Sequence, residues 1–574
     1  MRVLGIEGTA WCASAALYDA ETDSVLIESD PYEPDSGGIH PREAAEHMSE
    51  AIPAVVDRVL TAAEAEHGPD AVDAVAFSRG PGLGPCLRIV GTAARSLAGT
   101  LDVPLVGVNH MVAHLEIGRH RSGFDNPVCL NASGANAHLL GYHDGRYRVL
   151  GETMDAGVGN AIDKFTRHVG WSHPGGPKVE TAAAEFAAAA GGGESDGETA
   201  DAGLLDLPYV VKGMDFSFSG ISSAANDAAD DGVPVEEICF SLQEHVFAML
   251  AEVSERALSL TGADELVLGG GVAQNDRLRE MLAAMCEARG ADFFAPEPRF
   301  LRDNAGMIAV LGAKMAAAGD TVPIAESAVD PNFRPDQVPV TWRGGESVAR
   351  APGSGMSADG APARDSDADR RGAEATVTVT GSDGDRRAVK RRVEKSYRHP
   401  ELDRTLRRDR TVAEARLTSE ARRAGVPTPL VSDVDLATAT LTLQHVGERD
   451  LAAALDERWT EAVGRHLARL HGAGIVHGDP TTRNVRVSPE RAGSRGGNGE
   501  ADPPETYLID FGLGYHTGHV EDHAMDLHVF EGSVRATATD PDPLIAAFEA
   551  GYEAVGDGEV LERLRDVADR GRYR

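Results

Sequence analysis

The sequence predicts a duplicated α/β fold, followed by a linker and a second, smaller domain. An apolar strand, a turn of small residues and a returning strand occur at 2–18, and the same pattern recurs at 127–142. The chain changes character at 342–371, where Gly, Ser, Ala, Arg and Asp follow one another without periodicity. With 574 residues, the chain has room for several domains of about 150 residues each.

The formal charge of −36 is large for a chain of this length. Of the 55 basic residues only six are lysines, against 91 acidic residues. Scarce lysine with abundant acid resembles the surface of a protein kept soluble in high salt, and an ordinary acidic cytosolic protein is the alternative. The charge argues against non-specific binding of nucleic acid at ordinary salt, although a local basic patch stays possible.

The cysteine pattern and the hydropathy suggest a cytoplasmic protein. Five scattered cysteines without a C-x-x-C pair fit free thiols in a reducing compartment. The sequence opens on a predicted strand rather than on a signal peptide. Because no run of about 18 apolar residues occurs, we expect no membrane partner.

The first domain alternates between strands and helices up to residue 101. After the strands at 2–6 and 13–18 we expect a helix at 41–67, a strand at 71–77, a glycine-rich loop at 78–84 and a helix at 87–101. Backbone amides in turns such as Gly8-Thr9 can approach phosphates closely, although a plain hairpin reads the same way.

The stretch from Val103 to His114 is the most informative part of the chain. Its apolar run predicts a buried strand, and Asn109 offers a side chain that can cap a following helix. On that helix His110 and His114 are four residues apart, so both imidazoles face the same way. The pair can hold a divalent metal or consist of two ordinary packed histidines.

Further along, the first pattern is repeated. Strands are expected at 127–130 and 137–142 around the turn Asn131–Asn136, and a third strand at 266–268 runs into three glycines. We expect helices at 235–260 (amphipathic), 276–289 and 304–318, and a surface insertion at 188–203. Two such hairpins in one chain suggest a fold that grips a nucleotide between two halves.

These segments together resemble the universal tRNA threonylcarbamoyladenosine synthase (Kae) family. The matching motifs occur in order over about 320 residues: Gly8-Thr9, Ser78-Arg-Gly-Pro-Gly82, Asn109-His-Met-Val-Ala-His114, Ser133-Gly134, Asp163-Lys164 and Gly269-Gly-Gly271. The resemblance implies that residues 1–325 form two lobes of the fold that actin, sugar kinases and heat-shock ATPases share.

The resemblance also implies the site residues. The family binds a metal, iron or zinc, through two histidines and an aspartate, and the matching residues here are His110, His114 and Asp303. Without the resemblance, Asp303 would be interpreted as the cap of the following helix. Asn131 stands where the family often has a tyrosine, so a fourth ligand there could only be an amide oxygen. The implied substrate-binding residues are Asn131, Ala132, Ser133, Gly134, Ala135, Asp163, Gly176, Glu180 and Asn275.

The implied reaction moves a threonylcarbamoyl group from its adenylate to tRNA. The acceptor is the exocyclic amine of the adenosine 3′ of the anticodon in tRNAs that decode ANN codons. Partners would be tRNA, threonylcarbamoyl adenylate and the other subunits of the KEOPS complex, which are small dimerising and kinase-binding proteins. A metalloprotease is disfavoured, because Met111 follows the first histidine where a zincin needs glutamate.

Residues 372–574 carry a kinase-like set of motifs in the right order. Lys390 closes a strand, Glu414 lies in a basic helix at 404–423, and Asp479 and Asn484 stand five apart as in a kinase catalytic loop. Asp510 begins Asp-Phe-Gly. We expect Lys390, Glu414, Asn484 and Asp510 to bind Mg-ATP, with Asp479 as the catalytic residue.

The second domain departs from ordinary protein kinases. It lacks G-x-G-x-x-G near 372–379, has Gly478 where they usually have arginine, and ends 64 residues after Asp510. It resembles the small atypical kinase of the KEOPS complex, the Bud family, which archaea can carry fused to the synthase. Behind a largely disordered linker at 326–371 we expect a two-lobed α+β domain. It should act as an ATPase that supports the synthase more than as an atypical Ser/Thr kinase. The alternatives are a tRNA-binding scaffold with a non-catalytic kinase part, or a metabolite kinase on the actin-like fold.

Overall fold

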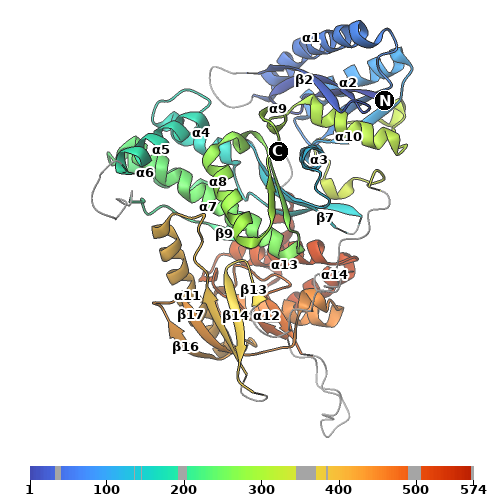
Figure 1. The fold of residues 1–574 in the computed structure, drawn as a ribbon. Coiled ribbons are helices and arrows are strands. Elements are labelled where there is room, and N and C mark those ends of the chain that lie inside the picture. Colours follow the sequence, from blue (N-terminus) through green and yellow to red (C-terminus); the bar gives the residue numbers. More distant parts are fainter. Residues whose placement is uncertain are drawn as a thin grey trace, which may run out of the picture.

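The computed structural model describes residues 1–32, 40–134, 136–143, 145–191, 203–343, 370–382, 386–488 and 506–570. We call residues 1–343 the first part and residues 370–570 the second part. Figure 1 shows the first part as two lobes, and the upper lobe contains both the earliest helices of the chain and α10. The second part, in yellow, orange and red, lies beneath the green helices of the first part (Figure 1).

The first part contains two five-stranded sheets with the same strand order. One sheet reads β3 (Ser24–Pro31), β2 (Cys12–Asp19), β1 (Arg2–Glu7), β4 (Ala74–Gly80) and β5 (Leu105–Asn109). The other reads β8 (Arg146–Glu152), β7 (Ala137–His143), β6 (Val128–Ala132), β11 (Glu265–Gly269) and β12 (Asp292–Phe294). In each sheet the first three strands pair antiparallel and the last two pairings are parallel. The predicted duplication is therefore confirmed.

The amino-terminal sheet is covered on both faces, because alternate residues of its strands point to opposite sides. Leu4 and Ile6 of β1 join a core with α1 (Pro41–His67) and α2 (Gly84–Leu101). Val3 packs on the other face in a core with α3 (His110–Ser122) and α10 (Ala305–Ala317). This second core also reaches the other sheet through Cys129 and Leu140, so it joins the two lobes.

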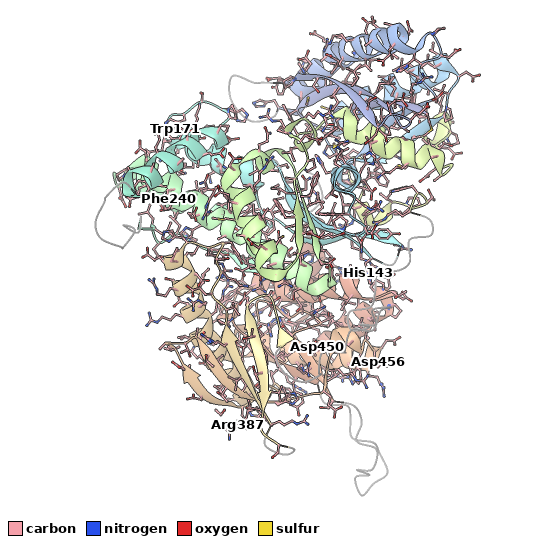
Figure 2. All side chains as sticks on the ribbon, in the orientation of Figure 1. His143, Trp171, Phe240, Arg387, Asp450 and Asp456 are labelled. Carbon is pink, nitrogen blue, oxygen red and sulfur yellow. The ribbon has the colours of Figure 1, made fainter. Side chains whose placement is uncertain are left out.

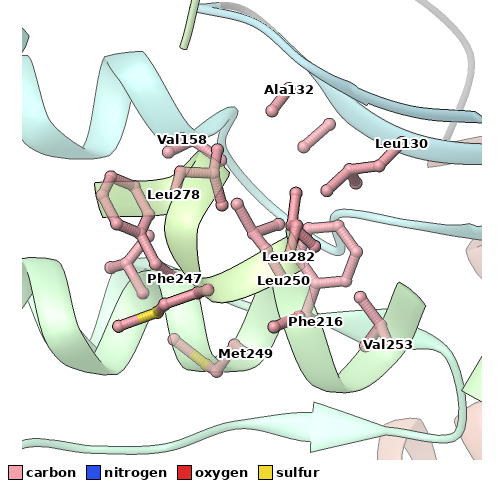
Figure 3. Packing of buried hydrophobic residues seen from close by; sticks show 14 of the residues in the cluster. Leu130, Ala132, Val158, Phe216, Phe247, Met249, Leu250, Val253, Leu278 and Leu282 are labelled. Atoms are coloured by element: carbon pink, nitrogen blue, oxygen red, sulfur yellow. The ribbon is translucent and has the colours of Figure 1, made fainter. Parts of the chain in front are cut away.

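The second lobe is built around a buried helix. Its helices are α4 (Val158–His168), α5 (Gly176–Gly191), α6 (Ser219–Asp230), α7 (Val235–Thr261) and α8 (Asp276–Arg289). Figure 3 shows Phe247 and Leu250 of α7 packed with Leu278 and Leu282 of α8 beneath the sheet. The expectation that α7 is amphipathic is wrong, because nearly every residue from 238 to 260 is buried. Its buried acidic side chains pair with basic groups, several of them from the second part.

The second part has two lobes of unlike structure, as predicted. One is a sheet of β13 (Arg370–Arg371), β14 (Ala375–Thr380), β15 (Arg387–Arg392), β17 (Thr440–Gln444) and β16 (Val431–Asp435), with α11 (Pro400–Arg423). The other is mainly helical, with α12 (Glu457–Gly472), α13 (Val520–Thr537), α14 (Pro541–Glu553) and α15 (Gly558–Arg570). Short strands complete it: β18 (Arg449–Asp450), β19 (Ile475–Val476), β20 (Val485–Val487), β21 (Thr506–Leu508) and β22 (Tyr515–His516).

Part of the expected linker packs against the first part. Val338 is buried, the Arg95 guanidinium donates to the Ser327 hydroxyl at 2.8 Å, and the Asn109 amide donates to the Phe333 carbonyl at 2.9 Å. Residues 344–369 lie outside the described residues. The same holds for 192–202 of the expected insertion, while 188–191 complete α5.

The two parts contact each other closely. β9 (Val211–Lys212) and β10 (Asp215–Phe216) form a hairpin that touches the second part, and the Gly213 amide donates to the Gly478 carbonyl at 2.9 Å. Lys395 Nζ lies 2.6 Å from a carboxylate oxygen of Glu255 on α7. With side chains drawn, the space between the two parts is filled (Figure 2). Within the part of the chain that the structure describes, every helix is too short or too polar to cross a membrane.

Candidate functional site

The histidine pair lies where β5 passes into α3. Asn109 caps the helix, because its side-chain oxygen accepts from the Val112 amide at 3.1 Å, as predicted. Asp303 follows the short helix α9 (Pro298–Leu301) and comes from the far end of the first part. The cap of α10 is Asn304, whose side chain accepts from the Met307 amide at 3.1 Å. Asp303 therefore does not serve as the cap.

His110, His114 and Asp303 form a cluster that can hold a metal ion. One ligand atom from each lies within 4.8 Å of the others. The two Nε2 atoms lie 3.4 and 3.3 Å from the same Asp303 carboxylate oxygen. The donor set fits a divalent metal, because two imidazoles and one carboxylate leave coordination positions open for substrate oxygens. Among the described residues no other group of three such ligands comes together.

Glu7 supports the first histidine, and sequence reasoning missed it. Its carboxylate is fully buried at the end of β1, with one oxygen 3.2 Å from His110 Nδ1. The other oxygen accepts from the Thr9 amide at 2.8 Å. An Nδ1–H that donates to Glu7 leaves Nε2 of His110 with a free lone pair on the Asp303 side. The sequence did contain a signal for this role, because Glu7 is the one acidic residue of β1 and follows the apolar run 3–6.

The electrostatics of the cluster suit a cation. Burial lowers the pKa of His110, but the charges of Glu7 and Asp303 outweigh burial and raise it to about 10. Burial and the charge of His110 leave the pKa of His114 below its usual value. The pKa of Asp303 is lowered despite its burial, because both histidines contact it. A bound divalent cation would take over the role of the proton on His110.

Two further polar side chains face this region from the second sheet. Asn131 on β6 and His138 on β7 are register partners, and both are buried. Among the described residues, neither the Asn131 side-chain oxygen nor either ring nitrogen of His138 has a hydrogen-bond partner. Burial and the nearby histidines lower the pKa of His138 to about 3, so its ring is neutral. Buried polar atoms without partners point to a bound group or water here.

Hydrogen bonds hold the turn after β6 in place, one within the turn and one to α4. The Ser133 hydroxyl donates to the Asn136 carbonyl at 2.8 Å, and the Gly134 carbonyl accepts from the Asn160 amide at 2.9 Å. Ala132 is buried in β6, and Ala135 lies outside the described residues. Gly134 is exposed, so its backbone can face a ligand.

The remaining predicted substrate residues form two groups in the second lobe. Asp163 accepts from the Gly175 amide at 2.7 Å, which places it beside Gly176 at the start of α5. Glu180 accepts from the Asp276 amide at 2.9 Å and so lies next to Asn275. The Asn275 oxygen caps α8 at 3.2 Å from the Leu278 amide, and its NH₂ donates to Gln243 at 3.2 Å. These bonds already use the Asn275 amide within the fold.

The kinase-like residues converge in the second part. Lys390 Nζ lies 2.8 Å from Glu414 and 2.7 Å from Asp510. The Asn484 amide donates to Asp479 Oδ2 at 2.9 Å. All five side chains line one cavity of about 570 Å³ between the two lobes of the second part. The cavity also has a wall from the first part, formed by Met214, Arg256, Ser259 and Leu260.

The carboxylates of this cavity differ in their affinity for protons. Burial raises the pKa of Asp479 to about 7, although the nearby Arg256 opposes the rise. Burial acts on Asp510 in the same sense, but the charges of Lys390 and Arg392 outweigh it and lower that pKa to about 2. Asp510 is therefore ionised at neutral pH and can hold Mg²⁺, whereas Asp479 can exchange a proton near neutral pH.

A buried aspartate that sequence reasoning missed holds the loop that carries Asp479. Asp526 of α13 accepts from the backbone amides of His477 and Gly478 at 2.7 and 2.8 Å. Gly478 has φ +80°, and a Cβ there would lie 2.2 Å from the Leu513 carbonyl oxygen. This explains why an arginine is not accommodated at this position.

The comparisons with known proteins agree with this arrangement. Residues 22–310 match the family model described as tRNA N6-adenosine threonylcarbamoyltransferase. A protein of Halobacterium salinarum is 67% identical over 100% of this chain and 99% of its own length, and one of Methanospirillum hungatei is 48% identical over 100% and 99%. Both are named probable bifunctional tRNA threonylcarbamoyladenosine biosynthesis protein. The chain belongs to this family.

Two solved structures that resemble the chain are remote from it in sequence. HypF of T. kodakarensis is 13% identical with a TM-score of 0.39, over 56% of this chain and 48% of its own. A Rio2 kinase complex from Chaetomium thermophilum is 15% identical with a TM-score of 0.23, over 35% and 69%. Both likenesses are too distant to support a conclusion. The acidic composition fits family members from Halobacterium and Haloquadratum, which share 67% and 64% of their residues with this chain.

Proposed function

We propose that the first part transfers the threonylcarbamoyl group from threonylcarbamoyl adenylate to tRNA. The acceptor is the exocyclic amine of the adenosine 3′ of the anticodon in tRNAs that decode ANN codons. The full-length relatives support this, because their names place them in the biosynthesis of that nucleotide. The observation that carries the proposal is the convergence of His110, His114 and Asp303 from distant segments within 4.8 Å.

The residues of the first part have separate roles in this proposal. His110, His114 and Asp303 hold one divalent metal, iron or zinc, which when bound supplies positive charge near oxygen atoms of the donor. Glu7 fixes the orientation of His110. The unpartnered oxygen of Asn131 faces the metal or the substrate in place of a phenol.

The nucleotide end of the donor would lie against the second lobe. The backbone of Gly134, exposed in its turn, can approach the phosphate closely. Asp163 and Glu180 can accept hydrogen bonds from ribose hydroxyls. Asn275 contributes through its position beside Glu180, since its own amide is engaged in the fold.

The second part supports the transfer as an ATPase. Lys390 contacts the phosphates, Asp510 and Asn484 hold Mg²⁺, Glu414 orients Lys390, and Asp479 positions the acceptor of the phosphoryl group. We expect the protein to act in the cytoplasm with tRNA and the small dimerising and kinase-binding subunits of KEOPS.

The direct test is reconstitution with threonylcarbamoyl adenylate and tRNA. The purified chain is incubated with both, with and without the partner subunits, and the tRNA is digested and analysed by mass spectrometry. We expect the modified adenosine, and none with a transcript that carries guanosine at that position. Absence of the product with every partner present would refute the proposal.

A further inference from the structure

Arg256 of α7 reaches from the first part into the ATP cavity of the second part. Its Nη1 atom lies 2.7 Å from Asp479 Oδ2, and its other terminal nitrogen pairs with Glu374 beside β14. The side chain is only 10% exposed. It lines the same cavity as Lys390 and Asp510. A cation from one part of the chain therefore stands among the phosphate-binding groups of the other.

The guanidinium is held from its own helix. Glu252, one turn earlier on α7, accepts from Arg256 Nε at 3.1 Å. Glu252 is itself buried and paired with Arg398, 2.6 Å away, and with Arg410 at 3.0 Å. The Nε edge of Arg256 is thus anchored, and its two terminal nitrogens are presented to the second part. A guanidinium held in this way loses little freedom when it meets a phosphate.

The sequence near 372–379 lacks the G-x-G-x-x-G motif with which ordinary kinases bind phosphate, and Arg256 can supply part of that binding. Glu374, which lies within 372–379, is negative, because four arginines, Arg256 first among them, hold its pKa well below the usual range despite burial. An arriving triphosphate would meet that negative charge unless a cation lies between them. Arg256 is placed there, and its five N–H donors can serve a carboxylate and a phosphate at once.

The bonds of Asp479 favour water as the phosphoryl acceptor. Its Oδ2 accepts from both Arg256 and Asn484, while for Oδ1 the described residues supply no hydrogen-bond donor. Oδ1 can therefore accept from a water molecule in the cavity. A serine of a protein substrate would instead have to pass the wall that Arg256, Ser259 and Leu260 form.

We propose that Arg256 is a catalytic residue of the ATP site, supplied by the first part, which binds the γ-phosphate and makes ATP hydrolysis depend on docking of the two parts. The water oxygen bonds to Pγ, and the bond from Pγ to the β,γ-bridging oxygen breaks. ADP leaves with that oxygen, and the proton of the water passes to Asp479 and then to solvent. The products are ADP and inorganic phosphate. This inference rests on the proposed ATP site.

The test compares Arg256→Ala and Arg256→Lys with wild type in the full-length chain. Phosphate release gives kcat and KM for Mg-ATP, and calorimetry gives binding of Mg-ADP with and without aluminium fluoride. We expect Arg256→Ala to lower kcat by about 1,000-fold or more, in the range of other arginines that face a transferred phosphoryl group. Mg-ADP should still bind within about threefold of wild type, whereas the tighter binding with aluminium fluoride should be lost.

Lys212→Met is the matched control. Lys212 also crosses between the parts, pairing with Asp522 at 2.8 Å, but it does not line the ATP cavity. Its removal should leave kcat within about twofold. An equal loss in both variants would mean that the loss comes from disturbed docking and not from the guanidinium, and would overturn the catalytic role of Arg256. Unchanged or faster ATP hydrolysis in Arg256→Ala would also overturn the proposal. A faster rate would mean that the contact of Arg256 with Asp479 inhibits hydrolysis.

Two outcomes keep the test decisive. If Arg256→Ala does not fold, Arg256→Lys decides, because lysine keeps the charge but loses the planar set of donors. For Arg256→Lys we expect a kcat at least tenfold below wild type, with Mg-ADP binding retained. An unchanged kcat in this variant overturns the proposal. If wild type binds no Mg-ADP at all, the ATP site itself fails. If wild type hydrolyses ATP and both variants match it, only the role of Arg256 fails.

Discussion

His114 and Asp303 are 189 residues apart in the chain, yet His114 Nε2 lies 3.3 Å from a carboxylate oxygen of Asp303. The contact joins α3 to the segment before α10 and depends on the packing of both helices against the amino-terminal sheet. We expect His114→Ala to abolish stoichiometric metal binding, because one of the three ligands is lost. The measurement is metal content per chain after dialysis against trace iron or zinc.

His120→Ala provides the comparison for this variant. His120 lies near the other end of the same helix and pairs with Asp23 at 2.7 Å. The metal content of that variant should equal that of wild type. Full metal retention in His114→Ala would contradict the proposed ligand set.

Glu7 should set the affinity of the metal rather than its presence. Glu7→Gln keeps the shape of the side chain but removes the charge that faces His110 Nδ1. Loss of such a supporting carboxylate typically weakens metal binding by about 10- to 100-fold. Competition with a chelator of known affinity gives the dissociation constant, and a value within about twofold of wild type would show that Glu7 has no such role.

A third prediction concerns the pH dependence of stability and two carboxyl groups where the two parts meet. Burial raises the pKa of Asp215 to about 7, and burial with the charge of Asp215 raises that of Glu152 to about 7. The folded state therefore keeps these protons up to about pH 7, while the unfolded chain loses them near pH 4. Stability should fall as pH rises from about 4 to 7, because the unfolded state binds fewer protons in that range.

Asp215→Asn tests this dependence directly. The Asn oxygen can still accept from the Glu152 amide, as Asp215 does at 2.9 Å. We expect the variant to melt higher than wild type at pH 8 and to lose much of that advantage at pH 5. Melting temperatures across this range at constant salt give the result. Asp433→Asn, at an exposed carboxylate, should leave the pH profile unchanged, and an identical profile for Asp215→Asn would refute the prediction.

Local patterns were enough to predict much of the first part. The helix expected at 41–67 spans the same residues as α1, and the helix at 276–289 matches α8, because each has a long apolar stripe between clear end signals. Strands β3 and β8 escaped prediction. The residues of β3 alternate between exposed and half-buried, so an edge strand of this kind lacks the apolar run that marks a buried one.

The site residues also differ in whether a local sequence pattern could predict them. His110 and His114 could be paired from their spacing, whereas Asp303 needed the family resemblance, since no local pattern links residues 189 apart. Arg256 could not have been found from sequence, because its role depends on how α7 docks against the second part. In the sequence, Glu252 and Arg256 look like the polar positions of an ordinary surface helix. Only the structure shows that the second part packs against α7 and buries them.

The last prediction separates a working ATPase from a scaffold. Asp510→Asn removes the charge that faces Lys390 and that would hold Mg²⁺. If ATP turnover drives modification, this variant should lose ATP hydrolysis and also the multiple-turnover formation of modified tRNA, while the metal content of the first part stays at the wild-type level. Phosphate release and nucleoside analysis of the same sample measure both. A variant that cannot hydrolyse ATP but modifies tRNA at the wild-type rate would instead establish the second part as a binding scaffold. Asp433→Asn, at an exposed carboxylate on β16 that does not line the ATP cavity, should change neither activity and controls for the general loss of a carboxylate charge.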